Sequence, residues 1–426
     1  MLKFVFEYFF NFWWLILPFI LGLIVWEKRL QTVRILYAQS IKWSYLELKT
    51  PLQVGKSIQS MEEIFSSLHS AFSKKSDYQR YIKGYLPPYF VFILFAHKGF
   101  LKFYIRTPEN LKNFVKTRIY AQYPHAEINE VDDPINFLPP KSPNPLTNCF
   151  LAEMTLTKKE PYPIKTYKVW ERAAEEERID PLSFLSEGAT QLNDDEWIII
   201  QIYAMPVPAE DEDFGNKWVD KGKKEVNKII GKKEEKEPSP LEMIGEFVWN
   251  LLRAPFVGVK WKEYKKDEKE ISMQKLTPGE RYVLEKLQEK LSKPGYWVSI
   301  RSLYFTFEPN FKEKLGRSLG LIFSFFKLYE TQNMNAFKPS KTTSPSEVIS
   351  PFTTKKSADV REFFQKRLMY LDFKSYSPPQ EKFILNTEEM ASIFHIPLET
   401  VPETTIEKAK ITPRPAPPTV PEPDIF

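Results

Sequence analysis

The feature that most constrains this chain is an uncharged apolar run near its N-terminus, YFFNFWWLILPFILGLIVW, at residues 8–26. As a helix that rises about 1.5 Å per residue, this run would just cross a hydrocarbon layer of roughly 30 Å. Trp13, Trp14 and Trp26 lie toward its ends, where aromatic side chains hold spanning helices at the headgroup level. The sequence therefore predicts a transmembrane anchor, with the membrane as a partner.

The charges that flank the run predict its orientation. Lys3 alone precedes it, whereas four basic residues follow: Lys28, Arg29, Arg34 and Lys42. By the positive-inside rule we expect a single-pass protein of the cytoplasmic membrane, with the N-terminus outside and residues 27–426 in the cytoplasm. A cleaved signal peptide is the alternative. It is disfavoured because no small-residue cleavage site follows and because the run exceeds a usual apolar region of about 7–15 residues.

A repeated pattern of strands and helices begins after the anchor and juxtamembrane helix of residues 1–42. Within residues 43–132, alternation and apolar spacing predict the order β-α-β-β-α-β, with a two-residue hairpin at Lys98-Gly99. This order is that of a ferredoxin-like sandwich, in which two helices cover one face of an antiparallel sheet. Lys112, Lys116 and Arg118 could form a phosphate-binding stripe on the second helix, but a solvated helix face is the preferred interpretation.

A Pro-rich linker at residues 133–148 leads into a second module at residues 149–385. Its first strand begins at Cys149, which is interpreted as a small buried residue. Its last strand could come from LMYLDF (368–373) or from EKFIL (381–385). The predicted fold class is therefore α+β: an N-terminal transmembrane helix followed by two ferredoxin-like (βαββαβ) modules, the second with a helical insertion.

The insertion in the second module covers residues 208–276 and is rich in lysine and glutamate. Its centre carries apolar residues at helical spacing. The residues of this face are Ile244, Phe247, Val248, Leu251 and Leu252. The helix could lie in a membrane interface, or it could pack on its own domain or on a partner subunit, because periodicity alone does not separate these environments. We expect the face to pack on lipid or on a partner.

A short helix is predicted at residues 386–397, ahead of a Pro-rich tail at residues 398–426. Asn386 and Glu389 have the spacing of a capping box, and Phe394 belongs to the apolar stripe. His395 lies in the last turn, where the helix dipole favours a cation, but a metal or catalytic role would need further ligands. The tail is expected to be extended, because it shows no apolar periodicity that could build a core.

Two stretches resemble a known group of proteins: HKGFLKFYIRTPENLKNFVKTRIYAQYP (97–124) and LNTEEMASIFHIP (385–397). They are similar to the N-terminal, non-ATPase region of conjugation or type IV secretion-like transfer proteins, and to an uncharacterised membrane-anchored family of candidate-phylum bacteria. In fused relatives, such a segment and a Pro-rich linker lead into a DNA-pumping ATPase of the HerA/FtsK kind, whereas this sequence ends at Phe426.

That resemblance has four implications. A HerA/FtsK-like ATPase, separately encoded, would be the partner. The helix with Asn386, Glu389 and Phe394 would lie close to it. DNA would be reached through this partner, and the chain would act as an oligomer within a larger assembly.

No motif of a catalytic site is recognisable in the sequence. Gly55-Lys56-Ser57 has Thr50 where a phosphate-binding loop needs its first glycine. Four scattered histidines and one cysteine do not make a metal site. We therefore expect no enzyme activity, no cofactor and no metal, and predict a non-catalytic, membrane-anchored platform for a translocation ATPase. The alternative is a structural inner-membrane subunit of a pilus or secretion envelope assembly.

Overall fold

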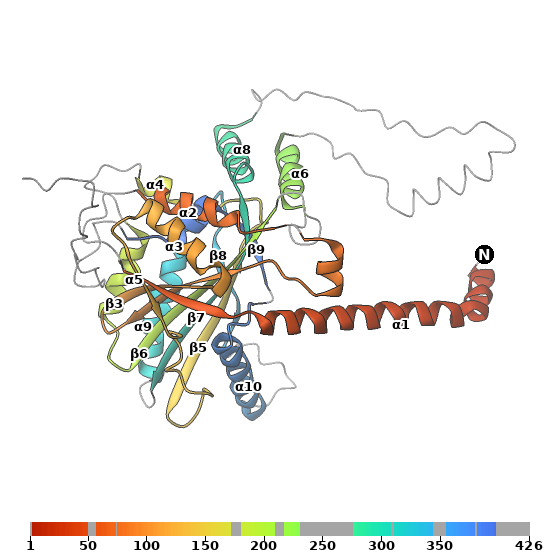
Figure 1. Cartoon of the computed structure of the whole chain (residues 1–426), viewed down its shortest axis with the longest axis horizontal. Helices are drawn as coiled ribbons and strands as arrows, with labels where there is room; N and C mark the ends of the chain where they lie inside the picture. The colour runs from red at the N-terminus through yellow and green to blue at the C-terminus, as the bar shows by residue number, and fades with distance from the viewer. Residues whose placement is uncertain are drawn as a thin grey trace, which may run out of the picture.

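Among the residues that the structure describes, nine strands form one antiparallel sheet in the order β4-β1-β3-β2-β6-β7-β5-β8, with β9 paired to β7 (Figure 1). The computed structural model describes residues 2–49, 57–73, 75–171, 180–208, 217–230, 276–307, 311–343, 355–379 and 381–397, without the side chains of residues 2–16, 312 and 355–359. The strands are β1 (Trp43–Lys49), β2 (Phe90–His97), β3 (Phe100–Pro108), β4 (Glu127–Val131), β5 (Thr147–Leu156), β6 (Glu196–Val207), β7 (Gly295–Phe307), β8 (Phe337–Thr342) and β9 (Phe383–Asn386).

Helices and short helical turns connect these strands. They are α1 (Leu2–Ser40), α2 (Gln59–His69), η1 (Tyr78–Ile82), η2 (Glu109–Leu111), α3 (Lys112–Gln122), α4 (Tyr167–Glu171), α5 (Pro181–Thr190), α6 (Trp218–Ile230), α8 (Pro278–Leu291), α9 (Phe311–Lys327), α10 (Lys355–Lys374) and α11 (Thr387–Ile393). The chain is thus α+β, with helices placed between the strands of an antiparallel sheet.

Each half of the sheet repeats one arrangement. The first half contains β1, α2, β2, β3, α3 and β4, and its strands lie in the order β4-β1-β3-β2. The second half contains β5, α5, β6, β7, α9 and β8, and its strands lie in the matching order β8-β5-β7-β6. The halves meet edge to edge, because residues 90–97 of β2 pair with residues 197–204 of β6. The two modules therefore share one sheet.

The two faces of the sheet are covered differently. Helices α2, α3, α5, α9 and α11 pack on one face, where they share a large apolar core with alternate residues of the strands. On the opposite face, Met369, Tyr370 and Phe373 of α10 pack on a second core. The consecutive residues Phe92 and Ile93 of β2 belong to different cores. This burial on both faces explains why β2 is a continuous apolar run.

The predicted membrane span is wrong. Across the described residues, no helix is long and apolar enough to cross a membrane. The single-pass localisation, the orientation and the anchoring role that depended on the span are corrected with it.

The last strands of the second module also differ from the predictions. LMYLDF (368–373) lies in α10. EKFIL (381–385) contains β9, which pairs with the start of β7. The fourth strand of the repeat is instead β8, which the sequence analysis did not predict. Its sequence, FKPSKT, has no apolar alternation because it is an edge strand with exposed lysines.

Candidate functional site

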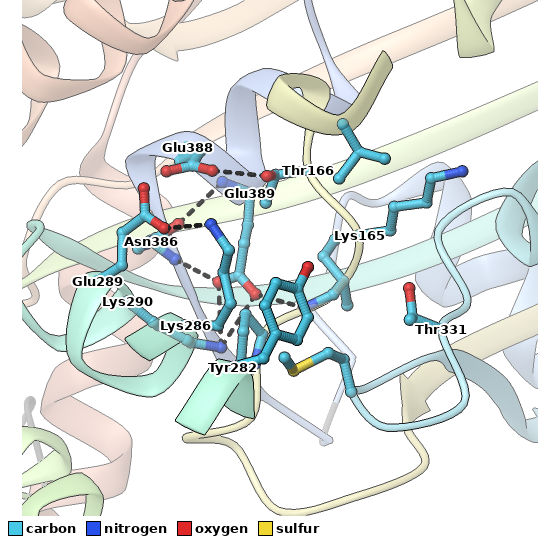
Figure 2. Close-up of a pocket in the computed structure, with 14 residues that line it drawn as sticks. Lys165, Thr166, Tyr282, Lys286, Glu289, Lys290, Thr331, Asn386, Glu388 and Glu389 are labelled. Carbon is cyan, nitrogen blue, oxygen red and sulfur yellow. Dashed lines mark hydrogen bonds and ion pairs between the residues drawn. The ribbon is translucent and has the colours of Figure 1, made fainter. Parts of the chain in front are cut away.

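Charged side chains gather where α8 meets β9 and α11 (Figure 2). They lie on the face of the sheet that α2, α3, α5, α9 and α11 cover. Helix α8 places Tyr282, Lys286, Glu289 and Lys290 on one side, because residues three and four positions apart share a helix face. The capping box predicted for α11 is confirmed. Asn386 Oδ1 accepts a hydrogen bond of 2.8 Å from the backbone N–H of Glu389, and the Glu389 carboxylate accepts one of 2.9 Å from the N–H of Asn386.

The centre of the cluster is a buried ion pair. Lys290 Nζ lies 3.0 Å from Glu389 Oε2, and both side chains are at most 1% exposed. Lys290 also donates to the carbonyl oxygen of Ile384, and Glu389 accepts from the N–H of Ile164. Burial raises the pKa of Glu389, and the Lys290 ammonium opposes that shift. The Lys290 ammonium and the backbone N–H groups of Ile164 and Asn386 all donate to the carboxylate, so they favour its ionised form against burial.

A second layer of ion pairs surrounds this centre. Glu388 accepts from Lys293 at 2.6 Å and lies 2.9 Å from Lys168 Nζ. Lys293 also reaches Glu62 of α2, at 2.5 Å, in the first half of the chain. Burial works to raise the pKa of Glu289, but hydrogen bonds from Lys168 and Lys286 lower it to about 2. The cluster therefore connects both halves of the molecule to α11.

The space beside the cluster is small. Its cavity of about 30 Å³ has room for one or two water molecules. The carboxylates of Glu388 and Glu389 and the ammonium of Lys290 all have partners. Among the residues that the structure describes, no group of three histidine, cysteine or acidic side chains could hold a metal ion. The geometry is therefore that of a structural cluster, with no room for a substrate in the space beside it. We call this cluster the latch; it consists of Lys168, Lys290, Lys293, Glu388 and Glu389.

A comparison with models of protein families shows which family the chain belongs to, because one model matches most of its length. The model of a family described as a domain of unknown function (DUF8128) matches residues 38–409, which is most of the sequence. The chain belongs to the DUF8128 family. A comparison with curated proteins found no match. The match includes both halves of the sheet and the latch of this DUF8128 domain.

The structure brings Asn386, Glu389 and Phe394 together in the interior of the DUF8128 domain. Their side chains are 2%, 0% and 0% exposed. The Phe394 ring centroid lies 5.0 Å from that of Phe92 and 5.8 Å from that of Phe103. A direct contact between these side chains and an ATPase would require them to leave the core. Their proximity to such a partner stays a prediction.

The structure describes only some of the other predicted site residues. Trp26 is 45% exposed on α1, whereas the side chains of Trp13 and Trp14 lie outside the described residues. The predicted interfacial face also lies outside them: Ile244, Phe247, Val248, Leu251 and Leu252. Cys149 is buried, and burial raises the pKa of its thiol to about 12, so it behaves as a small core residue.

The basic helix α3 is neutralised by nearby carboxylates. Lys112 pairs with Glu109 and Glu130, and Lys116 pairs with Glu130. Arg118 lies over the ring of Phe114 at 5.0 Å. These contacts favour the interpretation of α3 as a solvated helix face over a phosphate-binding stripe.

Sequence analysis missed the partner of His395. Nε2 of His395 lies 2.9 Å from Oδ1 of Asp180, and both side chains are fully buried. Asp180 also caps α5, since its carboxylate accepts from the N–H of Leu182. Asp180 and His395 are 215 positions apart, and nothing in the local sequence of either residue indicated that they would meet. The pair closes the other end of α11.

Proposed function

We propose that this chain is a non-catalytic scaffold that positions a separately encoded translocation ATPase in a transfer machine of the type IV secretion kind. The apolar surface of α1 carries the proposal. Between Leu17 and Trp26, eight apolar side chains are 45–68% exposed. They are Leu17, Phe19, Ile20, Leu21, Leu23, Ile24, Val25 and Trp26. Figure 1 shows that α1 extends away from the sheet.

Such a surface requires a partner. Consecutive residues of an α-helix are about 100° apart, so exposed side chains at positions 23–26 surround the helix. A helix that is apolar all round is stable when other apolar surfaces enclose it. Burial gains about 25 cal/mol per Å² of apolar surface. We infer that several helices, from the partner or from further copies, enclose α1.

The body of the molecule holds α1 in a defined position. Arg29 donates to the carbonyl oxygen of Tyr81 at 3.4 Å, and the rings of Tyr37 and Tyr85 are 5.6 Å apart. Gly84 has φ +68°, and a Cβ atom there would lie 2.6 Å from the backbone of Val33. A glycine is therefore required for this close approach. A rigid sheet with a fixed, projecting helix suits the role of a scaffold.

The identity of the partner rests on the resemblance of residues 97–124 and 385–397 to regions that precede HerA/FtsK-like motors. The first stretch contains β3 and α3, and the second contains α11. The latch joins α11 to the two halves of the sheet. This supports a role in which the chain provides a rigid position and the partner hydrolyses nucleotide.

The test is native co-purification of the tagged full chain. We expect a HerA/FtsK-like ATPase to be recovered with the wild type and to be lost with Leu21→Asp/Ile24→Asp, because two charges would be desolvated in the enclosed helix. Gln39→Asp, at an exposed polar position of the same helix, is the control and should retain the partner. Repeated purification without such an ATPase, or equal recovery with all three chains, would contradict the proposal.

A further inference from the structure

Helix α10 has apolar residues on two opposite sides. Met369, Tyr370 and Phe373 are fully buried against the sheet. The opposite side carries apolar residues that are 41–63% exposed. These outer residues are Val360, Phe364, Leu368 and Leu371. They recur at intervals of four, four and three residues, so they form one stripe along the helix.

Two opposite charges flank this stripe on the same side. Arg361 and Asp372 are eleven positions apart in the sequence, and eleven steps of about 100° bring a helix back to nearly the same direction. Both residues are exposed. Within the part of the chain that the structure describes, neither side chain forms an ion pair, whereas Glu362 and Lys366 on the inner side pair with each other at 2.8 Å.

We propose that α10 pairs with the α10 of a second copy of this chain, antiparallel and about a twofold axis near the level of residue 366. In an antiparallel pair the same flank of each helix meets the same flank of the other. Arg361 of each copy then lies beside Asp372 of the other, and Phe364 lies opposite Leu368. In a parallel twofold pair opposite flanks meet, so the Arg361 and Asp372 side chains of the two copies would lie on opposite sides of the seam and would form no ion pair with each other.

The twofold arrangement accounts for both features of the outer side. An isologous interface requires a surface that is complementary to itself. The stripe is symmetric about the level of residue 366. Val360 and Leu371 lie near its two ends, and Arg361 and Asp372 lie beside those ends. Each copy carries one positive and one negative charge on the same flank, so the flank is complementary to itself. Arg361 of each copy pairs with Asp372 of the other, which gives two equivalent ion pairs.

The interface is small, which sets the expected affinity. A stable interface contributes about 20–30 residues from each partner, whereas this stripe offers four apolar residues and two charges. We expect association in the micromolar range, about −8 kcal/mol at 1 µM. The pairing uses no residue of α1, so it is independent of the scaffold proposal and its failure would leave that proposal intact.

The first experiment is disulfide crosslinking between two differently tagged full chains. The native Cys149 is buried and leaves a low background. We expect Val360→Cys on one chain to crosslink with Leu371→Cys on the other upon mild oxidation, and Val360→Cys not to crosslink with itself. Val169→Cys, 44% exposed on α4, replaces Val360→Cys as the matched control and should give no crosslink. Self-crosslinking of Val360→Cys, or no crosslink above the control, would overturn the proposal.

The second experiment exchanges the charges and measures association by sedimentation of the full chain at several concentrations. Arg361→Asp alone and Asp372→Arg alone should each weaken association about fivefold, within the range for exposed ion pairs. The double variant restores both pairs with reversed sign and should return to the wild-type association constant. Double variants that associate no better than the single ones would overturn the proposed flank pairing.

Discussion

At the residue scale, the His395–Asp180 pair shows how buried polar groups satisfy one another. Nδ1 of His395 lies 2.9 Å from the carbonyl oxygen of Ala391, which can only accept a hydrogen bond. Nε2 faces Asp180 Oδ1, which also accepts from the N–H of Leu182. Both imidazole nitrogens therefore have partners, and the pair connects α11 to the start of α5 inside the core.

Replacing His395 should destabilise the fold strongly. His395→Gln leaves the fully buried Asp180 carboxyl without its imidazole partner, and an unsatisfied buried polar group costs about 1–3 kcal/mol. We expect this loss in the free energy of unfolding measured by urea denaturation. His125→Gln, at an exposed histidine, is the control and should change stability by less than about 0.5 kcal/mol. Equal stability of the two variants would contradict a structural role for the His395–Asp180 pair.

At the scale of elements, two capping boxes of the same type occupy different environments. Glu389 closes the box of α11 and is fully buried beside Lys290, whereas Glu280 closes the box of α8 at the surface. Glutamine can replace glutamate in a capping box. The two Glu→Gln substitutions therefore separate the contribution of the buried ion pair from that of the cap.

Glu389→Gln should cost about 3 kcal/mol because Lys290 is left buried without a counter-charge. Glu280→Gln should cost less than about 1 kcal/mol. Thermal or urea unfolding of both variants measures the difference. Addition of Lys290→Met to Glu389→Gln should recover part of the loss, since the unpaired ammonium is removed. No recovery in the double variant would show that the loss comes from packing.

The α4–α8 contact should give the fold a dependence on acidic pH. Lys168 and Lys286 lower the pKa of Glu289 to about 2 in the folded chain, compared with the ordinary value of 4.5. A lowered pKa stabilises the fold above pH 4.5, and this contribution is lost as the pH falls toward 2. Glu289→Gln should flatten that part of the stability–pH profile. Glu285→Gln, at an exposed position of α8, should leave the profile unchanged.

At the scale of the whole molecule, the shared sheet joins the two halves into one unit. Residues 90–97 of β2 pair along their length with residues 197–204 of β6, and both strands are buried on both faces. Lys293 and Glu62 add an ion pair between the halves. Stability is therefore expected to be shared, because neither half can expose its joining edge without opening the apolar core.

Ile200→Ala tests this coupling. Ile200 is fully buried on β6, and its truncation should cost about 2–5 kcal/mol. Native-state hydrogen exchange should show the same loss of protection in β1 and β3 as in β5 and β7. Val169→Ala, at an exposed site, should leave exchange unchanged. A loss of protection confined to the second half would show that the halves unfold separately.

The sequence alone determined the features that depend on neighbours along the chain. The capping box of Asn386 and Glu389, the Lys98-Gly99 hairpin and the strand–helix order of the first half follow from alternation, spacing and turn residues. The apolar run at residues 8–26 was a strong local signal of the same kind, yet its prediction of a span was wrong, because no helix in the described part of the chain is long and apolar enough to cross a membrane.

Only the tertiary structure decided the features that depend on distant residues. Lys290 and Glu389 are 99 positions apart, and Asp180 and His395 are 215 positions apart. No local pattern relates such residues, so the latch was not predictable. The same reason applies to β8, whose place at the sheet edge comes from pairing with β5, and to the joining of β2 with β6. Local spacing determines which elements form, whereas long-range packing decides which of their surfaces meet.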